Sequence, residues 1–264
     1  MKIGFIGCGN MAGAIMGGLI KNEIFKPEEI IASDSFEGSL KKAKEKYGVF
    51  ATGDNTECVK LSEVIVLSVK PQYYGEVIDE IKDFVSEDKL VITIAPGKTL
   101  NWLEEKFARR VKIIRTMPNT PALVGEGMTG VCKNKYVTDK DMDYALKILS
   151  SFGKAEVVSE SVMDAVVAVS GSSPAYVFML IEAMADGAVA GGMARAAAYE
   201  FAAQAVFGSA KMVLETGKHP AELKDMVCSP AGTTIAAVKT LEEKGFRGAV
   251  MDAMEKCIDV CRGM

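Results

Sequence analysis

Short apolar runs alternate with amphipathic stretches over residues 1–160 of this 264-residue chain. The runs are rich in Val and Ile and mostly lack polar alternation, which is typical of strands buried on both faces of a parallel sheet. The predicted strands are Lys2–Ile6, Ile30–Ser33, Val64–Ser68, Leu90–Ile94, Val111–Arg115 and Ala155–Val158. Helical spacing predicts crossover helices at Glu37–Tyr47, Tyr73–Phe84, Thr99–Phe107 and Thr138–Ser151. The pattern predicts an α/β domain over residues 1–160, built on a doubly wound parallel sheet.

Helical spacing replaces the strand pattern over residues 161–264. The predicted helices are Ser161–Ser170, Pro174–Gly191, Arg195–Thr216, Ala221–Val227, Thr233–Glu243 and Phe246–Arg262. Small residues such as Ala183, Gly187 and Gly191 would let helix axes approach closely. A bundle of this size with so much apolar surface is expected to bury part of it against a second copy. We therefore expect residues 161–264 to form an all-α domain for substrate binding and dimerisation.

The longest uncharged stretch, Ala165 to Ile181, is long enough to be weighed as a membrane span. The run Ser170-Gly171-Ser172-Ser173-Pro174 interrupts it, so two buried helices joined by a turn are the better interpretation. The chain enters its first strand at Lys2, without the basic-then-apolar leader of an exported protein. These features predict a cytoplasmic protein with no membrane partner.

Composition narrows the function classes further. With 49% hydrophobic and 25% charged residues the chain is ordinary for a soluble protein, and a net charge of −4 argues against nucleic acid as a partner. Six scattered cysteines without a Cys-x-x-Cys pair indicate reduced thiols. His219 is the only histidine, which excludes histidine-based zinc sites and Ser-His-Asp triads. No metal site is expected.

A glycine motif follows the first predicted strand, Gly7-Cys8-Gly9-Asn10-Met11-Ala12, and opens a helix. Gly7 would allow the tight turn, Gly9 would let the backbone approach a pyrophosphate, and Ala12 is small enough for close helix–strand packing. In this context the motif predicts a Rossmann-type dinucleotide site.

Asp34 follows the second strand, about 20 residues past the loop, where a carboxylate bonds the adenosine ribose of NAD. The hydroxyls of Ser33 and Ser35 would accommodate a 2′-phosphate, so NADPH and NADH both remain open. Later strand ends carry Val69-Lys70-Pro71, Ala95-Pro96-Gly97 and Met117-Pro118-Asn119-Thr120-Pro121, where ligands of such sheets lie. The predicted cofactor-binding residues are Gly7, Cys8, Gly9, Asn10, Met11, Ala12, Ser33, Asp34, Asn55, Val69, Lys70, Pro71, Ala95, Gly97 and Asn119.

A second motif, Cys228-Ser229-Pro230-Ala231-Gly232-Thr233-Thr234, has the composition of a turn feeding a helix N-terminus. The first amides of that helix lack intrahelical partners and would attract a small carboxylate. Two threonines would add hydroxyls that position or protonate the bound group. The alternative is that Ser229 or Thr233 simply caps the helix.

The hydride acceptor is either a carbonyl or an imine. A 3-hydroxy acid dehydrogenase needs a base, and the comparable stretch Ser170–Phe178 contains neither the lysine nor the asparagine of those enzymes, although Tyr176 remains as a candidate. A protonated imine is already a strong electrophile and requires only a carboxylate clamp and one hydroxyl near its nitrogen.

Several motifs together resemble the pyrroline-5-carboxylate reductase family, and the match covers essentially the whole chain. They are Phe5-Ile6-Gly7-Cys8-Gly9-Asn10-Met11, Val69-Lys70-Pro71, Met117-Pro118-Asn119-Thr120-Pro121-Ala122, Ser170-Gly171-Ser172-Ser173-Pro174-Ala175-Tyr176 and Val227-Cys228-Ser229-Pro230-Ala231-Gly232-Thr233-Thr234. The resemblance implies reduction of 1-pyrroline-5-carboxylate to L-proline with NADPH or NADH, the last step of proline biosynthesis. It also implies a homodimer interlocked through the helical domain, often assembled into a ring of dimers.

The resemblance implies roles for the second motif too. Ser229, Gly232, Thr233 and Thr234 would bind the substrate, with Thr234 bonded to the ring nitrogen as the catalytic residue. Ala231 stands where many members have glycine and is expected to exclude a positive φ. Asp34 stands where a 2′-phosphate contact would be expected.

Three alternatives stay open at this point. The first is a 3-hydroxy acid dehydrogenase-like oxidoreductase, and the second is a non-catalytic regulator that senses the dinucleotide. The third is a reductase of another cyclic imine, such as the six-membered homologue.

Overall fold

The computed structural model describes residues 2–263. The chain forms two compact units: the first runs to Ser172 and takes in the chain again from Cys257, and the second is Ser173–Lys256. The boundary between residues 160 and 161 stays a prediction.

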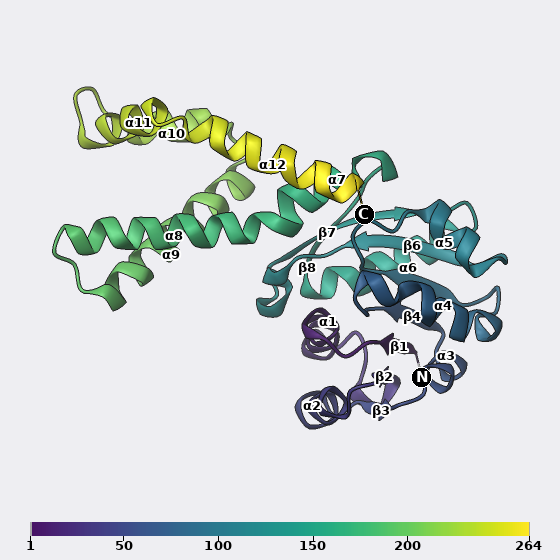
Figure 1. The fold of residues 1–264 in the computed structure, drawn as a ribbon. Coiled ribbons are helices and arrows are strands. Elements are labelled where there is room, and N and C mark those ends of the chain that lie inside the picture. Colours follow the sequence, from purple (N-terminus) through teal and green to yellow (C-terminus); the bar gives the residue numbers. More distant parts are fainter. Residues whose placement is uncertain (1, 264) are drawn as a thin grey trace. The chain divides into compact units, whose positions relative to one another are not determined.

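The first unit is built on one eight-stranded sheet in the order β3-β2-β1-β4-β5-β6-β7-β8 (Figure 1). Its strands are β1 (Ile3–Ile6), β2 (Ile30–Ser33), β3 (Phe50–Thr52), β4 (Val64–Leu67), β5 (Leu90–Thr93), β6 (Lys112–Met117), β7 (Gly127–Lys133) and β8 (Gly153–Val157). The strands β1 to β6 are parallel. Because β1 pairs with both β2 and β4, the order reverses there and creates the switch point at which such sheets bind ligands.

Two strands differ from the sequence-based expectation. β7 runs antiparallel to β6, and β8 pairs parallel with β7, so the sheet is not wholly parallel. β3 was missed because it has three residues and an exposed Phe50, and β7 because its two glycines break the apolar run. The predicted class, an α/β sheet domain followed by a helical domain, is confirmed.

Helices cover both faces of the sheet. One apolar core joins it to α1 (Asn10–Lys21), α2 (Glu37–Tyr47) and α6 (Asp139–Leu149). The other joins it to α3 (Asn55–Leu61), α4 (Tyr74–Ile81) and α5 (Leu100–Phe107). Alternate residues serve opposite faces, with Phe5 in the first core and Ile6 in the second, so β1 is buried throughout. Short 3₁₀ segments connect these elements at Pro27–Glu29, Pro71–Tyr73, Lys82–Phe84, Thr120–Val124, Ser150–Phe152 and Glu160–Val162.

The expected turn near Ser170 is wrong. The chain is helical from Glu160 to Ala190, through α7 (Met163–Val166), a π-helical segment Val167–Ser172, and α8 (Ser173–Ala190). The Ser170 hydroxyl donates to the Val166 carbonyl at 2.9 Å, so the serine adds a bond to the helix instead of ending it. By length and composition alone this run is long and apolar enough to cross a membrane. Only 11% of its most apolar window is buried, so the prediction of two buried helices is also wrong.

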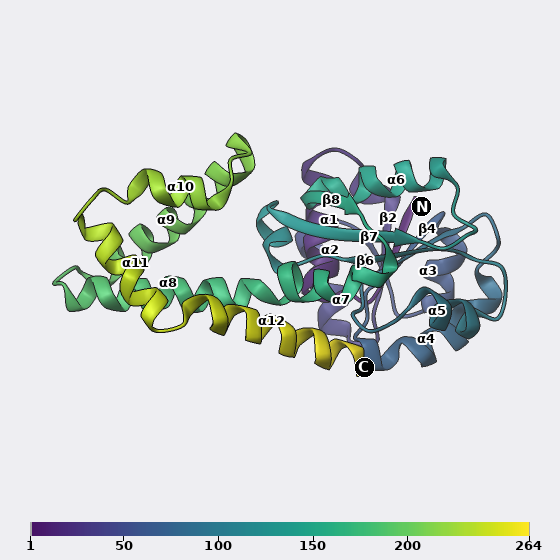
Figure 2. The same ribbon diagram turned by 90° about the horizontal axis from the view of Figure 1, so that it is seen from above.

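The second unit has little core of its own. It comprises α8, α9 (Arg195–Thr216), α10 (Pro220–Val227), α11 (Thr233–Glu243) and the first part of α12 (Phe246–Arg262). Its buried cluster consists of Ala185 of α8 and of Ala198 and Ala202 of α9. Figure 2 shows these two helices side by side. Large apolar side chains remain outside, including Phe201 at 67% exposure. Surface of this kind is what a helical domain presents to a second copy.

The end of α12 belongs to the first unit. The Cys261 thiol donates to Asp164 Oδ1 of α7 at 3.4 Å, and the Cys257 thiol donates to Ser172 Oγ at 3.2 Å. These contacts fasten the last turns of the chain beside α7 (Figure 2).

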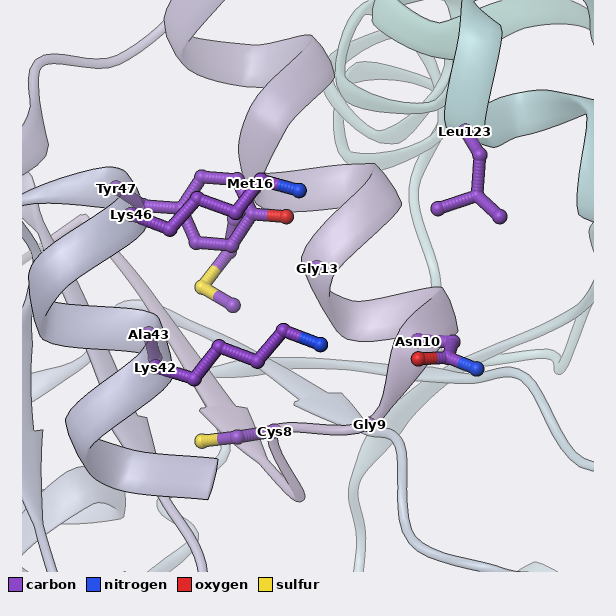
Figure 3. A pocket seen from close by; sticks show the side chains of 10 residues that line it. All are labelled: Cys8, Gly9, Asn10, Gly13, Met16, Lys42, Ala43, Lys46, Tyr47 and Leu123. Carbon is purple, nitrogen blue, oxygen red and sulfur yellow. The ribbon is translucent and has the colours of Figure 1, made fainter. Parts of the chain in front are cut away.

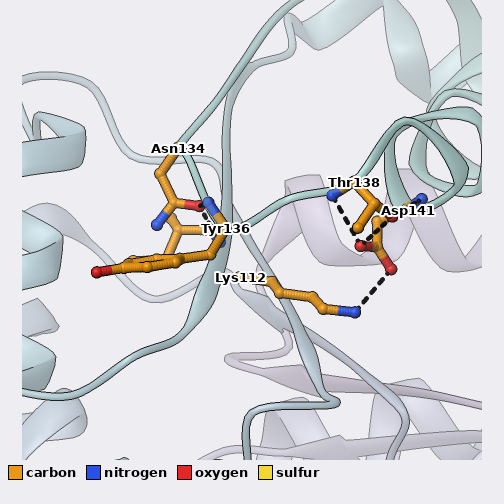
Figure 4. A network of polar contacts seen from close by, with 6 residues as sticks. Lys112, Asn134, Tyr136, Thr138 and Asp141 are labelled. Carbon is orange, nitrogen blue, oxygen red and sulfur yellow. Dashed lines mark hydrogen bonds and ion pairs between the residues drawn. The ribbon is translucent and has the colours of Figure 1, made fainter.

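A buried asparagine organises the far end of the β6–β7 pair (Figure 4). Asn134 is 5% exposed; its Oδ1 accepts from the amides of Ile113 (3.2 Å) and Tyr136 (3.3 Å). Its Nδ2 donates to the Val111 carbonyl at 3.0 Å and to Glu104 Oε1 at 2.9 Å. One side chain therefore satisfies backbone groups of Val111, Ile113 and Tyr136 that the start of β6 and the turn after β7 would otherwise leave unpaired.

We expect Asn134→Ala to lower the free energy of unfolding by about 2 kcal/mol, because it leaves buried backbone groups without partners. Urea unfolding at fixed protein concentration measures this. Asn101→Ala is the control, since Asn101 is an exposed asparagine bonded to Glu105, and its effect should stay within about 0.5 kcal/mol. Equal effects of the two variants would contradict the role given to Asn134.

Candidate active site

The ends of β1 and β4 nearly touch at the switch point. Gly7 has φ +102°, and a Cβ there would lie 2.8 Å from backbone atoms of Ser68 and Val69. The Ser68 hydroxyl donates to the carbonyls of Gly7 at 2.8 Å and Ile6 at 3.1 Å. Gly7 is therefore required by the chain's own packing.

Gly9 has no such requirement. It is the N-cap of α1 with φ −70°, and a Cβ there would meet nothing within 4 Å. No side chain caps this helix, so the amides of its first turn remain available. Open space and free amides at a helix N-terminus fit the pyrophosphate of a dinucleotide.

Asp34 is engaged with the loop itself. Its Oδ2 accepts from the Cys8 amide at 2.7 Å and its Oδ1 accepts from the Phe36 amide at 2.9 Å. Beside it the buried Ser33 hydroxyl donates to Asn55 Oδ1 at 2.8 Å. The predicted residues Ser33, Asp34 and Asn55 thus meet around the end of β2, where the carboxylate shapes the glycine loop.

The Cys8 thiol is not a nucleophile. Burial, with smaller contributions from Asp34 and Cys58, raises its pKa to about 12. The thiol therefore stays neutral at physiological pH.

The remaining predicted cofactor residues follow parallel strands and so share one edge of the sheet. Lys70 is exposed after β4, and Gly97 has φ +74° after β5. The Asn119 side chain is instead used internally: its Oδ1 accepts from the Met128 amide at 2.8 Å, and its Nδ2 donates to the Ser170 carbonyl at 3.0 Å. Asn119 braces the loop after β6.

Two lysines near the glycine loop were missed by the sequence analysis. A cavity of about 130 Å³ between α1 and α2 is lined by Gly9 and Asn10 on one side and by Lys42 and Lys46 on the other (Figure 3). Only the spacing of the lysines on α2 signals them, and many solvated helices share it. Within residues 2–263 no group of three or more His, Cys, Asp and Glu side chains could hold a metal.

The second motif forms a tight turn in the second unit. The Gly232 amide donates to the Ser229 carbonyl at 3.0 Å, and α11 starts at Thr233. Gly232 is the N-cap, and no side chain caps the helix, so neither Ser229 nor Thr233 has the capping role. The amides of Thr233 and Thr234 have no hydrogen-bond partner among the described residues. These free groups have the chemistry of a carboxylate site.

The expectation for Ala231 is wrong. It adopts φ +56°, the left-handed conformation that the alanine was expected to exclude. Pro230 and Ala231 occupy the two central positions of the turn, and the second of these requires a positive φ when the turn is of type II. The turn geometry therefore prevails over the alanine's preference.

Comparisons with known proteins agree over almost the full length. The chain is 54% identical to the pyrroline-5-carboxylate reductase of Escherichia coli (strain K12) over 258 residues, covering 98% of this chain and 96% of that protein. It is 49% identical to the enzyme of the same name from Methanosarcina acetivorans, over 96% of this chain and 94% of that protein. The chain belongs to the pyrroline-5-carboxylate reductase family.

Family models and solved structures of this family give the same result. A model described as pyrroline-5-carboxylate reductase dimerisation matches residues 160–264, and one described as NADP oxidoreductase coenzyme F420-dependent matches residues 2–97. A pyrroline-5-carboxylate reductase structure from Coxiella burnetii is similar with a TM-score of 0.92 and 36% identity, covering 99% of this chain and 97% of that one. The Plasmodium falciparum enzyme with NADP bound has a TM-score of 0.91 and 33% identity, covering 100% and 97%.

Gly9→Ala should separate binding from folding. The fold leaves room for the methyl group, so thermal stability should be unchanged or slightly higher, whereas KM for the dinucleotide should rise at least about tenfold. Calorimetry and steady-state kinetics measure the two effects. Gly7→Ala is the contrasting variant and should lower stability. Unchanged dinucleotide binding in Gly9→Ala would contradict the placement of the pyrophosphate.

Ala231→Gly should stabilise the protein by about 0.5–1 kcal/mol. Glycine removes the strain of the positive φ in the folded state, and the larger entropy that glycine gives the unfolded chain offsets only part of this gain. Urea unfolding at fixed protein concentration tests this. Ala231→Val should move stability the other way, since a β-branched residue tolerates positive φ least. A stability loss in Ala231→Gly would mean that this backbone conformation is wrong.

Proposed function

We propose that this chain reduces 1-pyrroline-5-carboxylate to L-proline with NADPH or NADH, the last step of proline biosynthesis. Family membership over almost the whole chain carries this conclusion, and the cap-free N-terminus of α11 supplies the chemistry that the substrate carboxylate needs. The bound nicotinamide supplies the hydride.

The glycine loop would hold the dinucleotide through the backbone amides of Gly9 to Ala12 at the start of α1. Cys8, Ser33, Asp34 and Asn55 would shape the site at the β2 end. Residues Val69, Lys70, Pro71, Ala95, Gly97 and Asn119 would line its course along the sheet edge. These roles stay proposals, supported by the shared edge and by the room at Gly9.

The substrate would be held by the turn and first residues of α11. The amides of Gly232 to Thr234 would bind the carboxylate, with the Ser229 and Thr233 hydroxyls beside it. The Thr234 hydroxyl would hydrogen-bond the ring nitrogen and help deliver the proton that balances hydride addition to the carbon. Since a protonated imine is already electrophilic, the chain needs mainly proximity and orientation. This agrees with His219, whose Nδ1 accepts from the Ala221 amide and only caps α10.

The chain has the dimerisation domain of its family, and the exposed apolar side chains of the second unit fit a homodimer. We extend this to a larger ring of dimers and to a cytoplasmic location. The six cysteines are all unpaired, which suits a reducing compartment. Light scattering of the purified protein tests the assembly.

The remaining alternatives differ in their assay results. A 3-hydroxy acid dehydrogenase would oxidise hydroxy acids, a dinucleotide-sensing regulator would bind cofactor without turnover, and a reductase of the six-membered imine would prefer that ring. Consumption of NADPH and NADH with each compound distinguishes these outcomes. No turnover of 1-pyrroline-5-carboxylate with either cofactor would end the proposal.

Thr234→Ala should lower kcat about 10²-fold, because proton-transfer help is typically worth 10²–10⁴-fold, while KM for the cofactor stays unchanged. Steady-state kinetics with 1-pyrroline-5-carboxylate measures this. Thr240→Ala is the matched control: the same helix carries this exposed threonine, whose hydroxyl only donates to the Ala236 carbonyl. Wild-type kcat and KM in Thr234→Ala would remove its assigned role.

A further inference from the structure

The cavity beside the glycine loop carries two ammonium groups. Gly9 and Asn10 form its wall at the start of α1, and Lys42, Lys46 and Tyr47 form its wall on α2. Figure 3 shows the Lys42 side chain extending from α2 across the Cys8–Gly9 segment toward the start of α1. None of the described residues that line the cavity carries a carboxylate.

The charge of Lys42 is not neutralised by the chain. Lys41, its neighbour on α2, lies 3.8 Å from Glu45, whereas Lys42 forms no hydrogen bond or ion pair with any residue of 2–263. The Lys46 ammonium lies 5.2 Å from the Tyr47 ring centre, a contact that leaves its charge intact. The cavity therefore has a net positive charge.

The lysine-bearing face of α2 is held in place against α1. A Cβ on Gly13 would lie 2.9 Å from the Tyr47 hydroxyl oxygen, and one on Gly17 would lie 3.3 Å from the Tyr47 ring. The two glycines let the ring seat directly on α1, and this contact fixes the α2 turns that carry Lys42 and Lys46.

The carboxylate of Asp34, at the end of β2, is hydrogen-bonded to the backbone. Both oxygens of Asp34 accept backbone amide hydrogens, from Cys8 and from Phe36. These bonds orient the carboxylate toward the loop. An anion between the loop and α2 would thus lie beside Lys42 and Lys46, while the Asp34 carboxylate is hydrogen-bonded to backbone amides.

We propose that Lys42, assisted by Lys46, binds the 2′-phosphate of NADPH and makes this enzyme select NADPH over NADH. This inference rests on the proposed dinucleotide site at the glycine loop. The pyrophosphate takes the amides at the start of α1, and the adenosine ribose lies at the β2 end, just before α2 begins at Glu37. A 2′-phosphate on that ribose would lie between the end of β2 and α2, and it is the phosphate that NADPH has and NADH lacks.

The test compares 2′,5′-ADP with 5′-AMP, two probes that differ only by the 2′-phosphate and need no turnover. Isothermal titration calorimetry should show Lys42→Ala binding 2′,5′-ADP about tenfold more weakly, because a charge-assisted hydrogen bond is lost, whereas binding of 5′-AMP should not change. In steady state, KM for NADPH should rise by a similar factor at constant kcat, and KM for NADH should not change.

Two further variants sharpen the result. Lys44→Ala removes the same charge from α2 outside the cavity and should leave both probes unaffected. Lys42→Arg keeps the charge and should retain most of the preference for 2′,5′-ADP. Raising the salt concentration should weaken the preference in the wild-type protein.

Three outcomes would overturn the assignment. Equal weakening of both probes would place Lys42 on the 5′-phosphate that they share, and unchanged binding of both would remove Lys42 from the site. An equal effect of Lys44→Ala would show that only the overall positive charge of α2 matters. None of these would affect reduction of 1-pyrroline-5-carboxylate by the wild-type protein. Absence of that activity with both cofactors would instead refute the proposed function.

Discussion

The close approach of two strand ends, β1 and β4, is the constraint on which the rest of the first unit depends. Gly7 permits it, and the Ser68 hydroxyl closes it through bonds to the carbonyls of Gly7 and Ile6. After β1 the chain continues to β2 and β3 on one side, and it then returns to β4 and β5 on the other side of β1. The connections after β1 and β4 therefore run in opposite directions and leave space above the ends of these strands. The helix that starts at Asn10 then presents free amides to that space. Packing, topology and binding chemistry are thus set by one backbone contact.

The parts of the fold that follow from composition could be read from the chain. Strands β1, β2, β4 and β5 are buried on every residue, so their Val- and Ile-rich sequences carry a clear signal. β7 has no such signal, since Gly130 lies where the Val166 side chain packs and a larger residue would clash. The missing turn at Ser170 has a related cause. Serine and glycine often break helices, but here the serine bonds back to Val166 and the glycine makes room for Met117, so tertiary contacts decide the outcome.

The candidate site also contains residues that the local sequence predicts and residues that only tertiary contacts bring into place. The glycine spacing predicts the dinucleotide loop, because each position has a stereochemical reason that holds in any such fold. Asp34 was placed near the ribose, yet its use of both oxygens on the amides of Cys8 and Phe36 depends on how the loop turns. Lys42 carries no local signal: its proposed role depends on the packing of Tyr47 against Gly13, a contact between residues more than thirty positions apart. Residues that act through tertiary placement cannot be recognised from local pattern.

The second unit shows why assembly and chemistry are linked in this family. Its buried cluster amounts to three alanines, and such a core cannot by itself offset the entropy of ordering five helices. The exposed apolar surface must therefore be covered by another chain if the turn before α11 is to be held in a defined place. That requirement matters because the proposed site uses backbone amides rather than a titratable side chain. An amide has a fixed position on its helix and gains its selectivity only from where the helix is held. A reaction that needs orientation more than acid–base power is thus well served by backbone amides carried on a dimerisation domain.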